Sequence, residues 1–306
     1  MQHSTQLTDL HLGKTWLTIG SFDGVHKGHQ ELIRQLVTKA HSNGAQAAVL
    51  TFHPHPVVVL RGKSDPFYLT SLDEKLELIE SLGVDYCITM EFNLTIASYT
   101  AQYFIQLLTQ HMVLKKLLVG QGFALGRGRT GDIATLTRIG EKVGYEVDVI
   151  DPVEKEGVIT SSSHIRKLIS DGEVDTAKGY LGREYSITGI ISHGDGRGRT
   201  LGFPTANIAI PQLRLLPKAG VYACRTLING MSYPSVANIG FRPTFNLPDP
   251  ALHLEVHILD YDEDIYGQLV NVEFIKYLRG EIKFSSVDHL VEQIQKDIIT
   301  AREILL

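Results

Sequence analysis

The stretch "TIGSFDGVHKGHQ", residues 18–30, marks a change from strand-like to helix-like sequence. Residues 16–22 read as a strand, and the apolar residues that follow recur with helical spacing, at Leu32, Ile33, Leu36, Val37 and Ala40. Small residues at the junction let the backbone come close to a ligand. A helix that begins near Gly28 directs its free N–H groups and the positive end of its dipole at an anion.

Two histidines lie at this junction. His26 and His29 are three residues apart and share one face of the first helical turn, where both can donate hydrogen bonds to phosphoryl oxygens. A metal site needs a third ligand, and the "HPH" at His53 and His55 has no neighbouring carboxylate, so zinc is weakly supported. A purely structural role stays open, but strand, turn and helix together favour phosphate.

The first half of the chain alternates between strand and helix patterns. Strand-like runs cover residues 16–22, 45–52, 84–92, 115–123 and 145–153, and helical periods lie between them. Ser71 and Glu74 form a capping box at the start of one helix. This alternation predicts a doubly wound α/β domain, which binds its ligand beyond the carboxyl ends of a parallel sheet.

The pattern changes near residue 183. Two short helices, at about 163–171 and 173–181, lead into short strand-like runs broken by Gly, Pro and Asn. Such spacing predicts an antiparallel barrel. A last helix from about Val287 places Leu290, Val291, Ile294, Ile298 and Ile299 on one face. We expect two domains, residues 1–182 with the helical joint and residues 183–306.

Composition excludes several classes of protein. The 306 residues carry a net charge of −5, so no basic surface for nucleic acid or anionic membrane is expected. The longest apolar runs have the length of a strand, and the N-terminal segment lacks the apolar core of a secretory signal. Cys87 and Cys224 lie far apart, which favours reduced thiols in a cytoplasmic protein. A homo-oligomer is neither required nor excluded.

A second glycine-rich stretch, "GRGRTG" at residues 126–131, fits the GxGxxG pattern of dinucleotide-binding proteins, and Asp151 follows twenty residues later. Such fingerprints belong to the first strand–helix turn, which residues 20–28 already occupy. Arg127 and Arg129 within the loop favour an exposed flap over closely packed glycines. We therefore do not expect NAD to bind here.

The stretch "HGDGRGRTLGFPTANI", residues 193–208, is the densest motif of the second half. Its glycine-rich loop, with Gly194, Arg197 and Arg199, can bind phosphates through backbone N–H groups and cations. Thr205 and Asn207 lie on the same side of an extended segment and offer two oxygens to a hard cation such as Mg²⁺. A flexible hairpin followed by an ordinary turn is the alternative.

"FDGVHKGH" resembles the HxGH signature of the nucleotidyltransferases, and with "TFHPHP" it looks like the bacterial riboflavin kinase/FAD synthetase family. The "SSTxIR" of that family has its counterpart in residues 161–166. The resemblance implies a Rossmann-like domain that transfers AMP from ATP to FMN and releases pyrophosphate. ATP would contact Gly20, Ser21, Phe22, Asp23, Gly24, His26, His29, Ser162, Ser163 and Arg166, with both histidines catalytic; the flavin would contact Phe52, His55, Pro56, Arg61 and Phe123.

One segment departs from the pattern of the family. Its members show "GxDFxFG" or "GxNFxFG", whereas this chain has "GQGFALG", with Gly122 at the polar position and Leu125 at the second aromatic one. Phe123 is retained. We expect this departure to affect the efficiency of FAD synthesis and not to abolish the reaction, since the expected phosphate contacts lie elsewhere.

"GFPTANI", "NIGFRPTF", "LEVHILDYDEDIYG" and "LRGEIKF" resemble the blocks of riboflavin kinases, in the same order. The resemblance implies a six-stranded barrel with a terminal helix that transfers the γ-phosphate of ATP to riboflavin and leaves ADP and FMN. Glu255 would be the catalytic base, Arg279 and Glu281 would close near the flavin, and Thr205 and Asn207 would hold Mg²⁺.

The expected function is therefore the synthesis of FMN and then FAD by one bifunctional transferase. Two alternatives stay open. In one, Gly122 and Leu125 weaken the adenylyltransferase and a kinase remains; in the other, one module serves as a flavin sensor. Retention of the histidines, Thr205, Asn207 and Glu255 argues against inactive modules, because binding alone needs no base.

Overall fold

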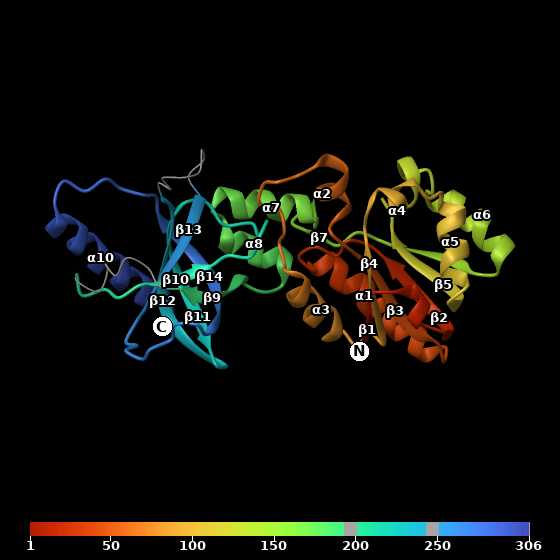
Figure 1. The fold of residues 1–306 in the computed structure, drawn as a ribbon, viewed down its shortest axis with the longest axis horizontal. Coiled ribbons are helices and arrows are strands. Elements are labelled where there is room, and N and C mark those ends of the chain that lie inside the picture. Colours follow the sequence, from red (N-terminus) through yellow and green to blue (C-terminus); the bar gives the residue numbers. More distant parts are fainter. Residues whose placement is uncertain (193–200, 243–250, 306) are drawn as a thin grey trace. The chain divides into compact units, whose positions relative to one another are not determined.

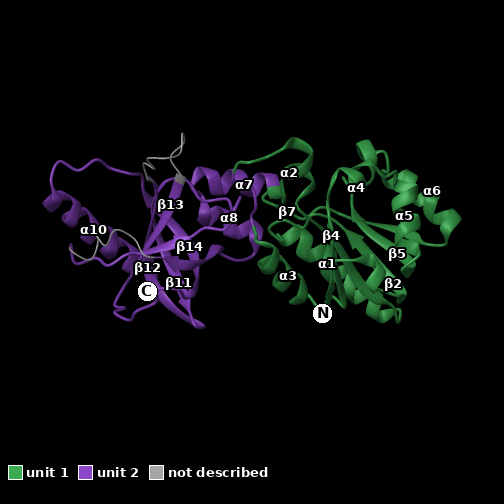
Figure 2. Ribbon diagram, in the orientation of Figure 1, with its two compact units in different colours: residues 1–65, 70–162 green, residues 66–69, 163–306 purple. Residues whose placement is uncertain are grey.

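The computed structural model describes residues 1–192, 201–242 and 251–305. Contacts divide the chain into two compact units (Figure 2). The first comprises residues 1–65 and 70–162, and the second comprises residues 66–69 and 163–306. The division falls before the two short helices, whereas 182/183 was expected; the boundary between the two activities stays a prediction.

The first unit is built on a six-stranded sheet in the order β1-β4-β3-β2-β5-β6, and all its pairs are parallel (Figure 1). The strands are β1 (Gln2–Ser4), β2 (Leu12–Ile19), β3 (Gln46–His53), β4 (Tyr86–Glu91), β5 (Met112–Gly120) and β6 (Glu146–Ile150). After β2 the chain adds β3 and β4 on one side of this strand, and it then crosses to add β5 and β6 on the other side. The sheet therefore has a topological switch point at the carboxyl end of β2.

Helices cover both faces of this sheet, as expected for a doubly wound fold. Helices α1 (Lys27–Ser42) and α3 (Leu72–Glu80) bury Ile33, Leu36 and Ile79 against Trp16, Val49 and Leu118. On the other face, α5 (Ala101–Thr109) and α6 (Ile133–Val143) bury Phe104, Leu108 and Leu136 against Leu17, Leu50 and Leu117. Adjacent strand residues such as Trp16 and Leu17 face opposite cores, as strand geometry requires.

Several elements of this unit were not expected from the sequence. They are β1, the short helices α2 (Pro56–Arg61) and α4 (Leu94–Ser98), the 3₁₀ turns η1 (Leu7–Asp9) and η2 (Arg127–Arg129), and a hairpin of β7 (Glu154–Lys155) and β8 (Val158–Ile159). All are six residues or shorter, so they lack the length that makes a periodic pattern readable. The capping box of Ser71 and Glu74 is confirmed, with both reciprocal hydrogen bonds present.

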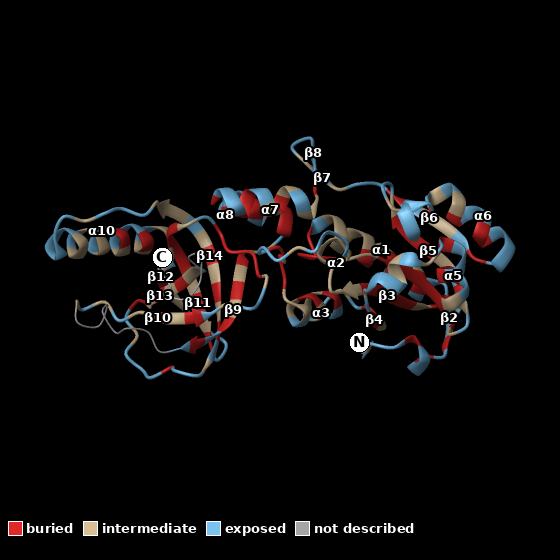
Figure 3. Cartoon of the chain, turned by 45° about the horizontal axis from the view of Figure 1, so that its top comes forward, coloured by how far each residue is buried: buried red, intermediate tan, exposed pale blue. Residues whose placement is uncertain are grey.

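The second unit is a closed antiparallel barrel in the order β10-β13-β12-β11-β14-β9. Its strands are β9 (Tyr185–Ser192), β10 (Ala206–Ala209), β11 (Gly220–Ile228), β12 (Met231–Arg242), β13 (Ala251–Ile258) and β14 (Leu269–Arg279). Inward residues are buried and alternate with more exposed ones, as along β9 (Figure 3). The expected fold, a six-stranded barrel with a terminal helix, is confirmed.

Among the described residues, helices α7 (Ser162–Asp171), α8 (Val174–Leu181) and α10 (Val287–Leu305) accompany the barrel. Helices α7 and α8 contribute Ile165, Ile169 and Tyr180 to the core that the barrel residues form. Helix α10 packs on the outside of β11, β12 and β14, and Ile299, which was expected on its apolar face, is exposed. No helix within the described ranges is both long and apolar enough to cross a membrane.

Candidate active sites

The turn that follows β2 has a constrained backbone. Phe22 and Val25 adopt positive φ angles of 47° and 36°, and Gly24 adopts 81°. Non-glycine residues in this region cost of order 1–3 kcal/mol each and tend to occur at functional sites. A Cβ on Gly20 would lie 3.0 Å from the ring of Phe22, so the buried phenylalanine packs directly under a glycine. The turn is therefore held in a shape that ordinary loops avoid.

His26 and His29 lie together at the start of α1. His26 is the N-cap, and its Nδ1 accepts a hydrogen bond from the backbone N–H of His29 at 3.3 Å. The two rings are stacked with centroids 3.6 Å apart. A Cβ on Gly28 would lie 3.2 Å from Cε1 of His26, so glycine leaves room for this ring. Since Nδ1 accepts, a neutral His26 carries its proton on Nε2.

Asp23 and Ser162 connect this turn to its surroundings. Oδ1 of Asp23 accepts from the backbone N–H and the hydroxyl of Thr70 at 3.3 and 3.4 Å, and Gly24 donates its N–H to the same hydroxyl at 3.1 Å. The hydroxyl of Ser162 donates to the carbonyl of Asp23 at 2.9 Å. Of the expected ATP contacts, the structure therefore brings Ser162 to the turn. Asp23 is 3% exposed and supports the turn from within.

Ser163 and Arg166 belong to the second unit. Ser163 is exposed. Arg166 donates through Nε to the carbonyl of Phe67 at 2.9 Å, and its guanidinium lies 3.8 Å from the centre of the Phe67 ring. Their expected contact with ATP stays a prediction.

The altered segment "GQGFALG" forms the turn after β5, at the same switch point as the histidine turn. Nothing lies within 4 Å of a Cβ built on Gly122. Phe123 packs against the core on one face of the sheet, and Leu125 is buried there. An apolar side chain at position 125 is thus a core residue in this chain.

The "GRGRTG" loop does not have the arrangement that was expected for an exposed flap. Arg127 and Arg129 are exposed, but a Cβ on Gly126 would lie 2.6 Å from the backbone nitrogen of Ala101. One on Gly131 would lie 2.4 Å from the Cβ of the same residue. The two end glycines are therefore closely packed against the start of α5. They pack against this helix, whereas residues 127–130 between them are exposed.

The remaining expected flavin contacts of this unit lie on β3 and α2. Phe52 is near the end of β3, with its ring centroid 5.5 Å from that of Phe92. His55 caps α2 and accepts from the N–H of Val57 through Nδ1 at 3.1 Å; Pro56 is the first residue of this helix. Arg61, the last one, is exposed.

In the second unit, Glu255 lies in a row of polar residues across three strands. It pairs in register with Asn207 of β10 on one side and with Asn238 of β12 on the other. Residues directly opposite one another point to the same face of a sheet. The neighbours Leu254 and Val256 are buried in the barrel core, so this row points outward.

A cavity of about 330 Å³ lies over two residues of this row, Glu255 and Asn238. Apolar residues from the barrel and from α10 contribute to its wall, among them Phe203, Val236, Leu290 and Ile294. Its polar lining residues include Glu255, Asn238, Arg279 and Glu281. A mostly apolar wall with a few convergent polar groups is typical of a site for an aromatic ligand. The structure therefore brings four expected kinase residues into one cavity: Thr205, Glu255, Arg279 and Glu281.

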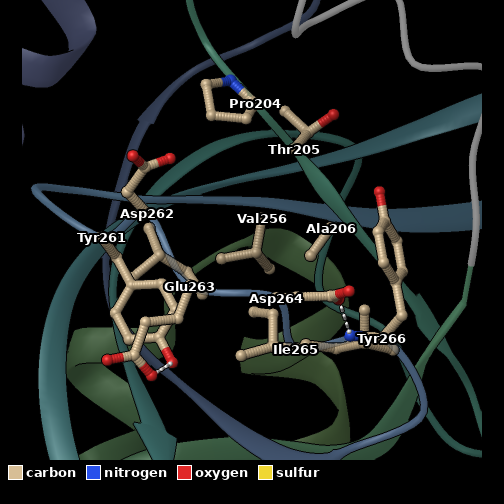
Figure 4. A pocket seen from close by; sticks show the side chains of 12 residues that line it. Pro204, Thr205, Ala206, Val256, Tyr261, Asp262, Glu263, Asp264, Ile265 and Tyr266 are labelled. Carbon is tan, nitrogen blue, oxygen red and sulfur yellow. Dashed lines mark hydrogen bonds between the residues drawn. The ribbon is translucent and has the colours of Figure 1, made fainter.

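A neighbouring cavity of about 360 Å³ shares Thr205 with the first one (Figure 4). It reaches the core residues Ala206 and Val256 and is bordered by the acidic segment from Tyr261 to Tyr266. Figure 4 shows Tyr261 donating to Glu263 at 3.2 Å and the N–H of Tyr266 donating to Asp264 at 3.1 Å. Thr205 thus marks the border between two adjacent cavities.

Gly194, Arg197 and Arg199, the expected phosphate contacts of the kinase, lie outside the described residues. Within the described ranges, no group of three or more His, Cys, Asp or Glu side chains is placed to hold a metal ion. Thr205 and Asn207 offer neutral oxygens and no carboxylate or imidazole. A cation held by this pair would complete its coordination with phosphate oxygens and water.

Three residues at these sites were not singled out in the sequence. Asn238 lies in the quoted "NIGFRPTF" block, and only the strand register shows that it neighbours Glu255. Asp297 is a charged residue on the buried side of α10, and its carboxylate holds Arg279 with contacts of 2.6 to 3.1 Å. Lys75 is a lysine only 6% exposed, and burial lowers its pKa to about 8. For Asp297 and Lys75, the sequence offers one signal, a charged residue on the apolar face of a helix.

Comparison with known proteins identifies the family of each half of the chain. The FAD synthetase family model matches residues 9–164, and the riboflavin kinase family model matches residues 181–305. Bifunctional riboflavin kinase/FMN adenylyltransferases are similar over nearly the whole chain. The protein of Escherichia coli K12 is 39% identical, with 94% of this chain and 91% of the relative covered. That of Bacillus subtilis is 36% identical, with 96% and 94% covered.

A solved structure has the same architecture throughout. A protein of Streptococcus pneumoniae, described as a macrolide-efflux protein, superimposes with a TM-score of 0.89 at 31% identity, with 98% of each chain covered. That likeness supports the fold, and the two family models and the curated relatives identify the activities. The chain belongs to the family of bifunctional riboflavin kinases/FMN adenylyltransferases, and it is a transferase that makes FMN and FAD.

Proposed function

We propose that riboflavin is phosphorylated at the outward row of the barrel, with Glu255 as the general base. Glu255 would take the proton of the ribityl 5′-hydroxyl while its oxygen attacks the γ-phosphorus of ATP, and the bond to the ADP oxygen breaks. One observation carries this proposal: the cavity that contains Glu255 meets the neighbouring cavity at Thr205. Flavin in the first cavity and nucleotide in the second would place the reacting groups at this border.

Thr205 and Asn207 fit a divalent cation at the same border. Asn207 lies opposite Glu255, and Thr205 lines both cavities. Hydroxyl and amide oxygens are ligands that Mg²⁺ accepts beside phosphate oxygens and water. When bound, the cation would offset the negative charge of the phosphates, which the nearby carboxylates of residues 262–264 would otherwise repel. The protein residues orient the flavin and take its proton.

We propose that FMN is adenylylated at the turn of the first unit. An oxygen of the FMN phosphate would attack the α-phosphorus of ATP, and the bond to pyrophosphate would break. The attacking group is already an anion and needs no base, so the protein has to stabilise charge. His26 and His29, stacked over the N-terminus of α1, are supported as the groups that contact the triphosphate.

Separate assays of the two half-reactions test both assignments. With riboflavin, ATP and Mg²⁺, the purified protein should give FMN and then FAD. Chromatography separates and quantifies these flavins. Glu255→Ala should abolish FMN formation from riboflavin and leave FAD formation from supplied FMN unchanged. His29→Ala should do the reverse, with a loss of about 100-fold or more in FAD formation.

The two variants serve as controls for each other, since each changes one unit. If Glu255→Ala still phosphorylated riboflavin at the normal rate, the assignment of the base would be wrong. If His29→Ala made FAD normally, the histidine turn would not be the adenylyl-transfer site.

A further inference from the structure

Lys75 is a buried cation next to the histidine turn. It lies on α3, and its ammonium donates to the carbonyl of Ser21 at 3.4 Å, to the hydroxyl of Thr51 at 3.1 Å and to the carbonyl of Phe52 at 3.3 Å. Lysine is rarely buried, because removing its charge from water is costly. An ammonium has three protons, and three acceptors surround this one.

These acceptors belong to the ends of two adjacent strands. Ser21 follows β2, whereas Thr51 and Phe52 are near the end of β3. The hydroxyl of Thr51 also donates to the carbonyl of Ser21 at 3.1 Å. The ammonium therefore fixes the backbone one residue before Phe22, where the turn enters its positive-φ conformation. Strained segments persist where their surroundings hold them in this way.

Asp23 offsets the charge of Lys75 only in part. Asp23 raises the pKa of Lys75, but burial is the larger effect and lowers it to about 8. Cys87 of β4 is a neutral thiol, because burial raises its pKa to about 12. His53 at the end of β3 is kept neutral, because burial and Lys75 lower its pKa. The side chain of Asp23 already accepts two hydrogen bonds from Thr70.

We propose that Lys75 is a positioning residue for adenylyl transfer: it holds the Ser21 turn in shape and places a buried positive charge behind the bound triphosphate. The inference rests on the proposed function of the first unit. The ammonium does not touch the substrate. It acts through the backbone of the turn and through its field, which a buried environment screens less than water does.

The test compares Lys75→Met, which keeps an unbranched chain and removes the charge, with Lys75→Arg, which keeps it. Lys142→Met, at an exposed position on α6 of the same unit, is the matched control. For Lys75→Met we expect kcat/KM for ATP in FAD formation to fall about 10- to 100-fold, as for other groups that act through a neighbour. Riboflavin phosphorylation by the same polypeptide should be unchanged. Trp16, the only tryptophan, reports whether the first unit is folded.

The pH profile separates a charge effect from a purely structural one. The logarithm of kcat/KM reports the free enzyme. As pH rises through about 8, Lys75 loses its proton and FAD formation should decline. Lys75→Met should lack this inflection, and Lys75→Arg should stay active across it, because a guanidinium keeps its proton.

Three outcomes would overturn the inference. They are normal kcat/KM in a folded Lys75→Met variant, an inflection near pH 8 that persists in this variant, and loss of activity only in step with loss of the Trp16 signal. If the unsubstituted protein made no FAD from FMN, the proposed function itself would fail. Normal FAD synthesis in Lys75→Met would instead reject the role of Lys75 alone.

Discussion

At the scale of single residues, the HxGH spacing follows from the crowding at the start of α1. His26 must cap the helix and also stack on His29 three residues later. The ring of His26 then passes within 3.2 Å of where a Cβ of residue 28 would lie, and 3.2 Å is closer than side-chain contacts normally allow. A side chain at position 28 would therefore require the His26 ring to shift, whereas glycine leaves the ring in place.

The departure at Gly122 has a different character. A Cβ at Gly122 would meet nothing within 4 Å, and the φ of this residue is not positive. Packing therefore does not force glycine at this position, whereas Gly131 a few residues later is enclosed.

This contrast gives a prediction for stability. Gly131→Ala should lower the free energy of unfolding of the first unit by about 1–3 kcal/mol, because the added methyl group would meet Ala101 and the carbonyl of Leu125 at 2.4 and 2.7 Å. Gly122→Ala is the matched control and should change stability by less than about 0.5 kcal/mol. Urea denaturation followed by Trp16 fluorescence measures both. Equal stability of the two variants would contradict the packing described for the loop.

At the scale of elements, α10 connects the C-terminal segment with the cavity that Glu255 lines. Leu290 and Ile294 line the cavity, and Ala301 and Leu305 pack on the barrel. Asp297 interrupts this apolar face; it is 7% exposed and holds Arg279 by two nitrogens. Gln293, one turn earlier, donates to the same carboxylate at 2.9 Å. The helix thus orients Arg279, a residue of β14, through the carboxylate of Asp297.

Asp297→Asn should raise the KM for riboflavin about 10-fold or more and leave FAD formation from FMN unchanged. An amide cannot balance the guanidinium, and an uncompensated charge in a buried site is strongly unfavourable. Initial-rate assays of both half-reactions measure the effect. Glu292→Gln, at an exposed position of the same helix, is the control. Unchanged riboflavin kinetics in a folded Asp297→Asn variant would show that Arg279 needs no such support.

At the scale of the molecule, the barrel unit includes a short segment from within the sequence of the first unit. Residues 66–69 belong with the barrel unit: the N–H groups of Phe67 and Tyr68 donate to the carbonyl of Leu213 at 2.7 and 2.9 Å. Leu69 joins the barrel core, as do residues of α7 and α8. The barrel core therefore extends beyond residues 183–306.

A fragment of residues 163–306 should accordingly be more stable than one of residues 183–306. The shorter fragment loses Ile165, Leu168, Ile169, Val174 and Leu181 from the core, and each buried aliphatic side chain contributes about 1.5–3 kcal/mol. Thermal denaturation and riboflavin kinase assays of the two fragments test this. Equal melting temperatures and activities would place the boundary of the kinase at the expected residue 183.

The sequence by itself determined the two architectures, because their signals are local. Alternating strand and helix periods over residues 16–153 specify the doubly wound sheet, and closely spaced short strands after residue 183 specify the barrel. The same holds for the motifs that identify the family: the histidine turn, Thr205 with Asn207, and Glu255 each lie within a short contiguous stretch.

Only the tertiary structure decided which residues surround those motifs. Lys75 reaches Ser21 across 54 positions of sequence, Asp297 reaches Arg279 across 18, and Asn238 meets Glu255 through strand register. The division at residue 162 and the enclosure of Gly131 also depend on contacts between distant segments. Local periodicity carries no information about which buried charge faces which turn, because that pairing is set when separate elements pack together.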